Sequence, residues 1–101
     1  MNISIKATHT SLSESMKESV EQKMGQLEVF LRPEDKVHVE LAVDPRHRAG
    51  PVNRAEISIK PHGIFAQAYS DDVYSALDMV IPKVREQLVK LKDKKLSERR
   101  S

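Results

Sequence analysis

The chain has 101 residues, of which 39% are hydrophobic and 32% are charged, with a formal net charge of +2 and no cysteine. These values indicate one folded domain with a single modest core, and they exclude a disulfide framework or a thiolate metal site. No apolar run is long enough for a membrane span or a signal peptide, so we expect a cytoplasmic protein.

The N-terminal region predicts a strand followed by a helix. Hydrophobic and polar residues alternate over residues 2–8, the period of two of a strand with one buried face. A capping-box pattern then begins at Ser11, although Ser13 is an alternative cap. We expect Pro33 and Asp35 to end the helix. Its apolar stripe consists of Met16, Val20, Met24, Leu27 and Leu31.

The middle of the chain predicts three strands, because hydrophobic and polar residues alternate over residues 37–43, 55–60 and 64–69. A tight turn at residues 61–63 joins the last two, and a longer basic loop over residues 44–53 joins the first two. Each strand has one apolar face, so we expect helices to cover one side of the sheet only.

The last third of the chain predicts a long helix that begins after Asp72, where acidic residues suit the positive end of the helix dipole. Pro82 either kinks this helix, at a cost of about 3 kcal/mol, or begins a second helix from its first turn. We expect the chain to fray from Leu96, which divides it into a single domain at 1–95 and a short, disordered basic tail at 96–101. The apolar stripe consists of Val73, Leu77, Val80, Val84, Leu88 and Leu91.

These elements predict an α+β fold of order β-α-β-β-β-α, with a four-stranded sheet and two helices on one of its faces. A right-handed crossover through the first helix should place the first strand parallel to a neighbour, and the other strands should form a meander. No linker or internal repeat divides the chain.

Positive charge is concentrated near the C-terminus. Residues 83–101 carry eight Lys or Arg against three acids, whereas the first 45 residues carry five bases against eight acids. A local imbalance of this kind suggests a polyanionic partner, because the field at a surface depends on the patch and not on the total charge. A solvated helix end gives the same pattern.

Basic side chains should flank the apolar stripe of the last helix. At about 100° per residue, Lys83, Lys90 and Lys94 fall on one side of the helix. Arg85 and Lys92 fall on the other side. Such flanks could bind phosphates on both sides of a groove, although lysines that only border a core stripe would look alike.

Two other features are compatible with binding. Arg46 and Arg48 add a second basic site in the loop between the second and third strands. Phe65 and Tyr69 should face solvent on the uncovered side of the sheet, where aromatic rings can stack on unpaired bases. Cross-strand packing or a small patch for a protein partner is the more common reason for such aromatics.

Signals of catalysis are poor. The four histidines, at positions 9, 38, 47 and 62, lack the spacing of metal ligands. Asp71, Asp72 and Asp78 are explained by a helix start and a solvated face, and there is no glycine-rich phosphate loop. We therefore expect a protein that is not an enzyme, with no metal, no cofactor and no small-molecule substrate.

One combination of residues is specific. It consists of Asp72-x-Tyr74-x-Ala76-Leu77-Asp78, then Lys83, Gln87-Leu88 and Lys90, with support from Ile3-x-Ile5, a cap near Ser13, Lys23 and Leu27-Glu28. On these residues the chain resembles the short ribosome hibernation-promoting factors, the family that includes the ribosome-associated translation inhibitor and the sigma-54 modulation protein. The resemblance covers residues 1–95.

The resemblance implies a fold similar to double-stranded RNA-binding domains and binding in the messenger and transfer RNA cleft of the small ribosomal subunit. There the factor would silence idle ribosomes by occupancy, without chemistry. The implied partners are this subunit and its rRNA, with the protein a monomer away from the ribosome. The candidate ribosome-binding residues are Lys23, Arg46, Arg48, Lys83, Arg85, Lys90, Lys92 and Lys94.

Two departures from the family pattern stand out. Glu86 occupies the place before Gln-Leu where the family usually has arginine, and Gln26 replaces a lysine beside Leu27. We therefore expect RNA contact to depend on the last helix and the tail. The basic residues 97–101 resemble the promoter type, which is associated with ribosome dimers, more than the inhibitor type with its acidic tail.

A rival hypothesis is a protein-interaction module. It would use the open face of the sheet, around Phe65 and Tyr69, to bind a regulator such as a sigma factor.

Overall fold

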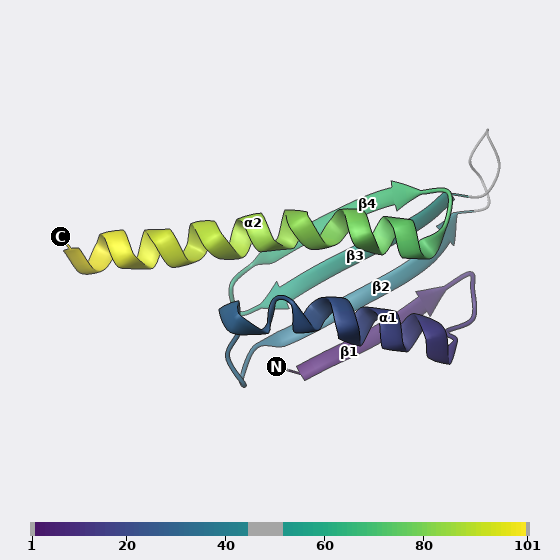
Figure 1. The fold of residues 1–101 in the computed structure, drawn as a ribbon, viewed down its shortest axis with the longest axis horizontal. Coiled ribbons are helices and arrows are strands. Elements are labelled where there is room, and N and C mark those ends of the chain that lie inside the picture. The colour runs from purple at the N-terminus through teal and green to yellow at the C-terminus, as the bar shows by residue number, and fades with distance from the viewer. Residues whose placement is uncertain (1, 45–51, 101) are drawn as a thin grey trace.

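The computed structural model describes residues 2–44 and 52–100, with side chains as far as Lys94. Four strands form one sheet, and two helices lie on one of its faces (Figure 1). The order β-α-β-β-β-α and the α+β class are therefore confirmed. The elements are β1 (Asn2–Thr8), α1 (Glu14–Gly25), a 3-10 turn η1 (Glu28–Phe30), β2 (Lys36–Asp44), β3 (Val52–Lys60), β4 (Ile64–Ser70) and α2 (Val73–Arg100).

The strands lie in the spatial order β1-β2-β3-β4. β1 pairs with β2 in parallel, with Ile3 opposite Val37, so α1 is the crossover between parallel neighbours that the sequence predicted. β2, β3 and β4 form the predicted antiparallel meander. The turn between β3 and β4 includes Gly63 at a φ of 69°, a left-handed conformation that glycine adopts without steric cost.

The core lies between the helices and one face of the sheet. Alternate side chains of each strand point into it, as the period of two requires. The stripe of α2 covers β3 and β4, and that of α1 lies beside it. Burial of these stripes holds both helices on the sheet. Fully buried side chains include Val20, Met24, Leu27, Val39, Leu41, Ile57, Ile59, Leu77, Val80 and Val84.

The first helix is shorter than predicted. Ser13, not Ser11, is its N-cap, and the Ser13 hydroxyl accepts a hydrogen bond from the Met16 amide at 3.1 Å. The expectation that the helix continues to Pro33 is wrong, because α1 ends at Gly25. Glycine is a poor helix former, and from here the backbone tightens into i to i−3 bonds, such as the one from the Leu27 amide to the Met24 carbonyl.

The last helix is longer and less interrupted than predicted. α2 runs continuously through Pro82, so the alternative of a second helix beginning there is wrong. The backbone of α2 is helical to Arg100, over a run of strong helix formers with no glycine. The division into a domain at 1–95 and a tail at 96–101 stays a prediction.

Candidate nucleic-acid interface

The C-terminal half of α2 projects past the sheet, so it is covered by the domain on fewer sides than the first half (Figure 1). The helix begins at a capped end, where the Asp72 carboxylate accepts hydrogen bonds from the Ser75 amide at 2.9 Å and the Ser75 hydroxyl at 2.8 Å. The bond from the Ser75 amide is the main cause that lowers the pKa of Asp72, so the carboxylate stays charged at the positive end of the helix.

One basic flank of α2 faces the edge strand β4. The Lys83 ammonium donates a hydrogen bond to the Gln67 carbonyl at 3.0 Å. One turn later, the Gln87 side chain bonds to the main chain of Phe65. The predicted contact of Lys83 with RNA stays a prediction, and in this structure one N–H of its ammonium group bonds to a strand carbonyl. Lys90 and Lys94 continue the same flank.

The other basic flank faces α1. Lys23, in the last turn of α1, forms an ion pair with Asp78 on α2. Asp78, Arg85 and Lys92 are seven residues apart and so share one side of the helix. The Lys23 side chain is 25% exposed, so its ammonium links the two helices at the border of this surface.

The exposed cations differ in how far they are neutralised. Lys90 lies 3.1 Å from Glu86 in an i, i+4 pair, so Glu86 reduces the local positive charge. Arg85, Lys92 and Lys94 are exposed and form no ion pair within the described part of the chain. These three are the cations of α2 most available to an outside anion. Arg46 and Arg48 lie outside the described residues.

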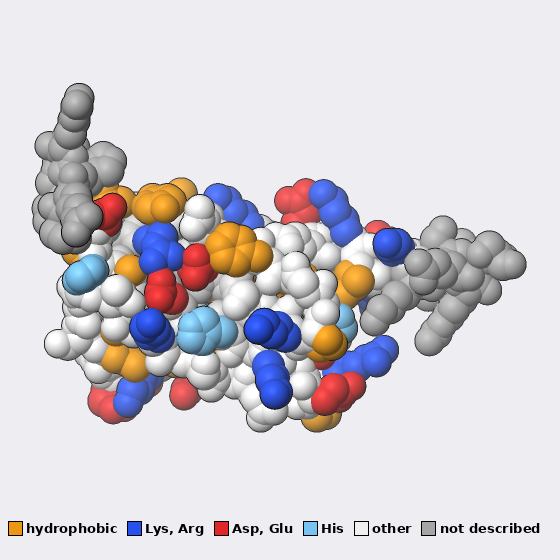
Figure 2. Space-filling view, turned by 180° about the vertical axis from the view of Figure 1, so that it is seen from behind, with side chains coloured by type: hydrophobic (Ala, Val, Ile, Leu, Met, Phe, Trp, Pro, Cys, Tyr) orange, Lys and Arg blue, Asp and Glu red, His pale blue; other side chains and the backbone are white. Residues whose placement is uncertain are grey.

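In the middle of the open face of the sheet, basic and acidic side chains form ion pairs. Arg54 bonds to Glu40 and, at 3.0 Å, to Glu56, and Lys6 lies 4.0 Å from Glu40. Figure 2 shows basic and acidic side chains next to each other on this face. The hydrogen bond from Arg54 is the main cause that lowers the pKa of Glu40. Phe65 and Tyr69 are about half exposed on this face, as predicted, with relative exposures of 51% and 50%.

Sequence reasoning did not predict the contacts of two groups of polar residues. The first consists of Lys83 and Gln87, which satisfy the edge of β4. Their spacing of four on one helix flank was visible, but the identity of the edge strand was not. The second consists of Lys36 and Lys60 on the open face, which become neighbours only through strand register. The sequence signal that could have found these two lysines was the alternation of their strands, because each lysine lies next to a residue predicted to be buried.

Two searches of the described residues concern other kinds of site. No group of three or more potential metal-ligating side chains comes together among residues 2–44 and 52–100. None of the helices described there has the length and apolar character needed to cross a bilayer.

Comparison with known proteins decides the family. The sequence profile of the family described as "Sigma 54 modulation protein / S30EA ribosomal protein" matches residues 3–96. The chain belongs to this family. Among relatives in the S30EA family, the "Ribosome hibernation promoting factor" of Escherichia coli K12 is 30% identical over 94 residues, which cover 93% of this chain and 96% of the relative.

Two solved S30EA-type structures have similar folds. The "ribosomal subunit interface protein" from Coxiella burnetii matches with a TM-score of 0.70 and 25% identity, and the match covers 92% of this chain and 99% of that one. The Thermus thermophilus "Protein Y N-terminal domain" matches with a TM-score of 0.73 and 22% identity over 90% of this chain and 99% of that one. At that identity the second comparison supports the fold alone.

Proposed function

We propose that this protein is a ribosome hibernation factor that binds the small ribosomal subunit in the messenger and transfer RNA cleft and silences idle ribosomes. Membership of the S30EA family supports an association with the ribosome. The observation that carries the proposal is the set of exposed cations on α2, with Arg85 in the first half of the helix and Lys92 and Lys94 in the projecting half. In this role the protein acts in the cytoplasm, with rRNA as its direct partner.

The mechanism is occupancy. Cations on α2 would contact rRNA phosphates and release their counterions, which supplies affinity without reading base sequence. The bound domain would then exclude messenger and transfer RNA from the cleft by its volume. No bond is made or broken in this process, so it requires no catalytic residue or cofactor. Promotion of ribosome dimers is a further role that binding in the cleft would allow.

The test is co-sedimentation of the purified protein with isolated small ribosomal subunits over a range of salt concentrations. We expect the protein to pellet with the subunits, transfer RNA to compete, and affinity to fall steeply with salt. The double variant R85Q/K92Q should bind more weakly and lose about one unit of log–log salt slope per phosphate contact removed. Lys83 is left unchanged, because it supports β4.

The matched control is K6Q/K17Q, which removes the same charge from β1 and α1, at side chains that are 63% and 44% exposed. It should bind as the unmodified protein does. Equal binding by R85Q/K92Q would exclude Arg85 and Lys92 as contacts with the subunit. Absence of pelleting at low salt would contradict ribosome binding itself, and it would favour the rival module that uses the open sheet face on a protein partner.

A further inference from the structure

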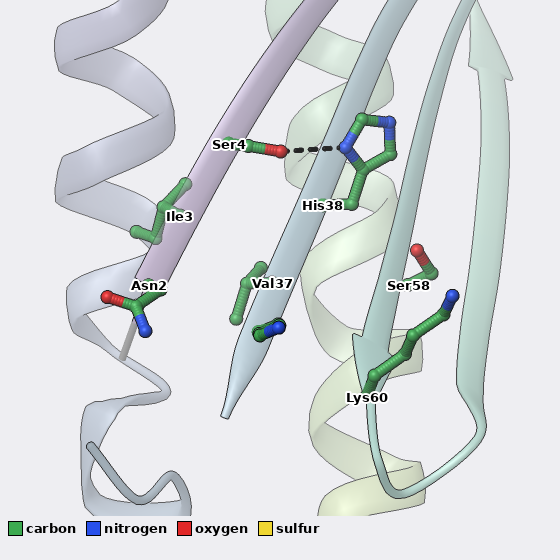
Figure 3. Close-up of a pocket in the computed structure, with 8 residues that line it drawn as sticks. Asn2, Ile3, Ser4, Val37, His38, Ser58 and Lys60 are labelled. Carbon is green, nitrogen blue, oxygen red and sulfur yellow. Dashed lines mark hydrogen bonds between the residues drawn. The ribbon is translucent and has the colours of Figure 1, made fainter. Parts of the chain in front are cut away.

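A hollow of about 540 Å³ lies on the open face of the sheet, away from both helices (Figure 3). It occupies the end of the sheet near the N-terminus of β1 and the last residue of β3. This volume is within the range of about 300–1,000 Å³ typical of small-ligand sites. The described residues that line it, with no acid among them, are Asn2, Ile3, Ser4, Lys36, Val37, His38, Ser58 and Lys60.

Two lysines lie directly opposite each other in this hollow. Lys36 on β2 is the register partner of Lys60 on β3, and both are exposed. Side chains in such positions lie about 5 Å apart at Cβ, and like charges there destabilise a sheet. Neither lysine forms an ion pair within the described part of the chain, and the acids nearest to them along these two strands, Glu40 and Glu56, are bonded to Arg54.

The adjacent row of side chains adds hydrogen-bonding groups and an aromatic ring. Ser4, His38, Ser58 and Phe65 follow one another across the four strands. The Ser4 hydroxyl lies 2.8 Å from His38 Nδ1, which orients the imidazole and leaves Nε2 for a ligand (Figure 3). Figure 3 also shows Lys60 extending toward Ser58. Phe65, directly opposite Ser58, offers its half-exposed ring beside the hollow.

We propose that this face is a second RNA-binding surface, which holds a single-stranded segment with a phosphate between Lys36 and Lys60 and a base on Phe65. An anion between the two ammonium groups replaces repulsion with attraction. A positive groove beside an exposed aromatic ring is the usual arrangement of single-strand sites. The surface lies on the face of the sheet opposite α2, and the proposal does not depend on ribosome binding.

The test is a titration of the ¹⁵N-labelled full-length protein with hexauridylate at low salt, followed by amide chemical shifts. We expect shifts at Lys36, His38, Ser58 and Phe65 that K36Q/K60Q loses and K6Q retains, since Lys6 lies on the same face beside Glu40. Shifts on α2 report the other surface separately. The proposal would be overturned if hexauridylate caused no chemical-shift change on the open face. It would also be overturned if K36Q/K60Q showed the same shift changes as the unmodified protein.

Two further experiments test the contact of a base with Phe65 and whether the ligand is an RNA strand or a single nucleotide. Phe65→Ala should weaken binding at this face at least about fivefold, and Phe65→Tyr, which keeps a ring, should restore it. Uridine monophosphate should bind more weakly than hexauridylate. Equal affinity for uridine monophosphate and hexauridylate would show that the site does not require single-stranded RNA. If Phe65→Ala binds hexauridylate as tightly as the unmodified protein does, no base stacks on Phe65.

The repulsion between the lysines can be tested without any ligand. Lys60→Glu should raise the Tm, because it creates an opposite-charge pair with Lys36, and it should abolish the open-face shifts. Loss of binding together with a higher Tm cannot result from unfolding. A Tm that does not rise would show that the two lysines do not repel each other, and the reason for an anion between them would be removed.

Discussion

The side-chain amide of Gln87 on α2 bonds to both main-chain groups of Phe65 on β4. Its Nε2 donates to the Phe65 carbonyl at 2.7 Å, and its Oε1 accepts from the Phe65 amide at 3.4 Å. One turn earlier, Lys83 donates to the Gln67 carbonyl. Because β4 is an edge strand, these groups would otherwise be open to pairing with another chain. The helix therefore protects this edge of the sheet.

Removal of the Gln87 amide should destabilise the fold. Gln87→Ala leaves the Phe65 main-chain groups to water, and we expect the free energy of unfolding to fall by about 1 kcal/mol. Urea denaturation measures the change. Gln22→Ala is the matched control, because Gln22 is an exposed helical glutamine and the substitution gains the same helix propensity. An equal effect of the two substitutions would show that the bonds to Phe65 contribute nothing.

The ion pair between Lys23 and Asp78 should couple the two helices weakly. Its side chains are 25% and 59% exposed, so solvent screens the attraction. A double-mutant cycle of Lys23→Ala and Asp78→Ala, read by urea denaturation, should give a coupling of about 0.5 kcal/mol. The coupling should decrease as salt is added. Additive effects at low salt would mean that Lys23 is free for an outside partner.

Asp35 should matter more, because it is the buried polar residue of the described core, with 1% exposure. Its carboxylate lies 3.0 Å from His62 Nε2 and accepts a hydrogen bond from the Arg32 amide at 2.9 Å. It thereby joins the segment before β2 to the turn after β3. Asp35→Ala should lower the free energy of unfolding by about 1–3 kcal/mol, mainly because the Arg32 amide loses its acceptor.

The His62 contact can be separated from that of Arg32. Asp35→Asn keeps an acceptor for the Arg32 amide and should cost less than Asp35→Ala. His62→Ala removes the other contact and leaves the Arg32 bond in place. If all three variants unfold at the same urea concentration as the unmodified protein, Asp35 does not hold these segments together.

The ion network on the open face should contribute to acid sensitivity. The pKa of Glu40 is lower in the folded protein than its ordinary value of 4.5, mainly because of the hydrogen bond from Arg54. The network therefore stabilises the fold above pH 4.5, and this contribution is lost as the pH falls through the lower folded pKa. Glu40→Gln should flatten the fall of the urea midpoint over that acid range. Glu18→Gln, which removes an exposed carboxylate from α1, is the control, and an equal flattening would contradict a special role for Glu40.

The element order and the faces of the elements were predictable, because burial imposes a period on each element regardless of its partners. The alternation from Val37 to Val43 and the stripe from Val73 to Leu91 were sufficient to predict which side chains would be buried. Helix ends were less predictable. The propensity of Gly25 to end a helix had to be weighed against an apolar stripe that continued to Leu31, and the 3-10 turn satisfied both.

The polar contacts of the candidate surfaces were not predictable in the same way. Helical spacing indicated that Lys83, Lys90 and Lys94 share a flank of α2, and the sequence alone was sufficient for this prediction. That Lys83 meets a strand carbonyl, and that Lys23 meets Asp78, depended on which strand lies at the edge of the sheet and how the helices cross it. The pairing of Lys36 with Lys60 depended on strand register. Periodicity fixes the direction of a side chain within its own element, whereas its partner is set by the packing of elements that are distant in the chain.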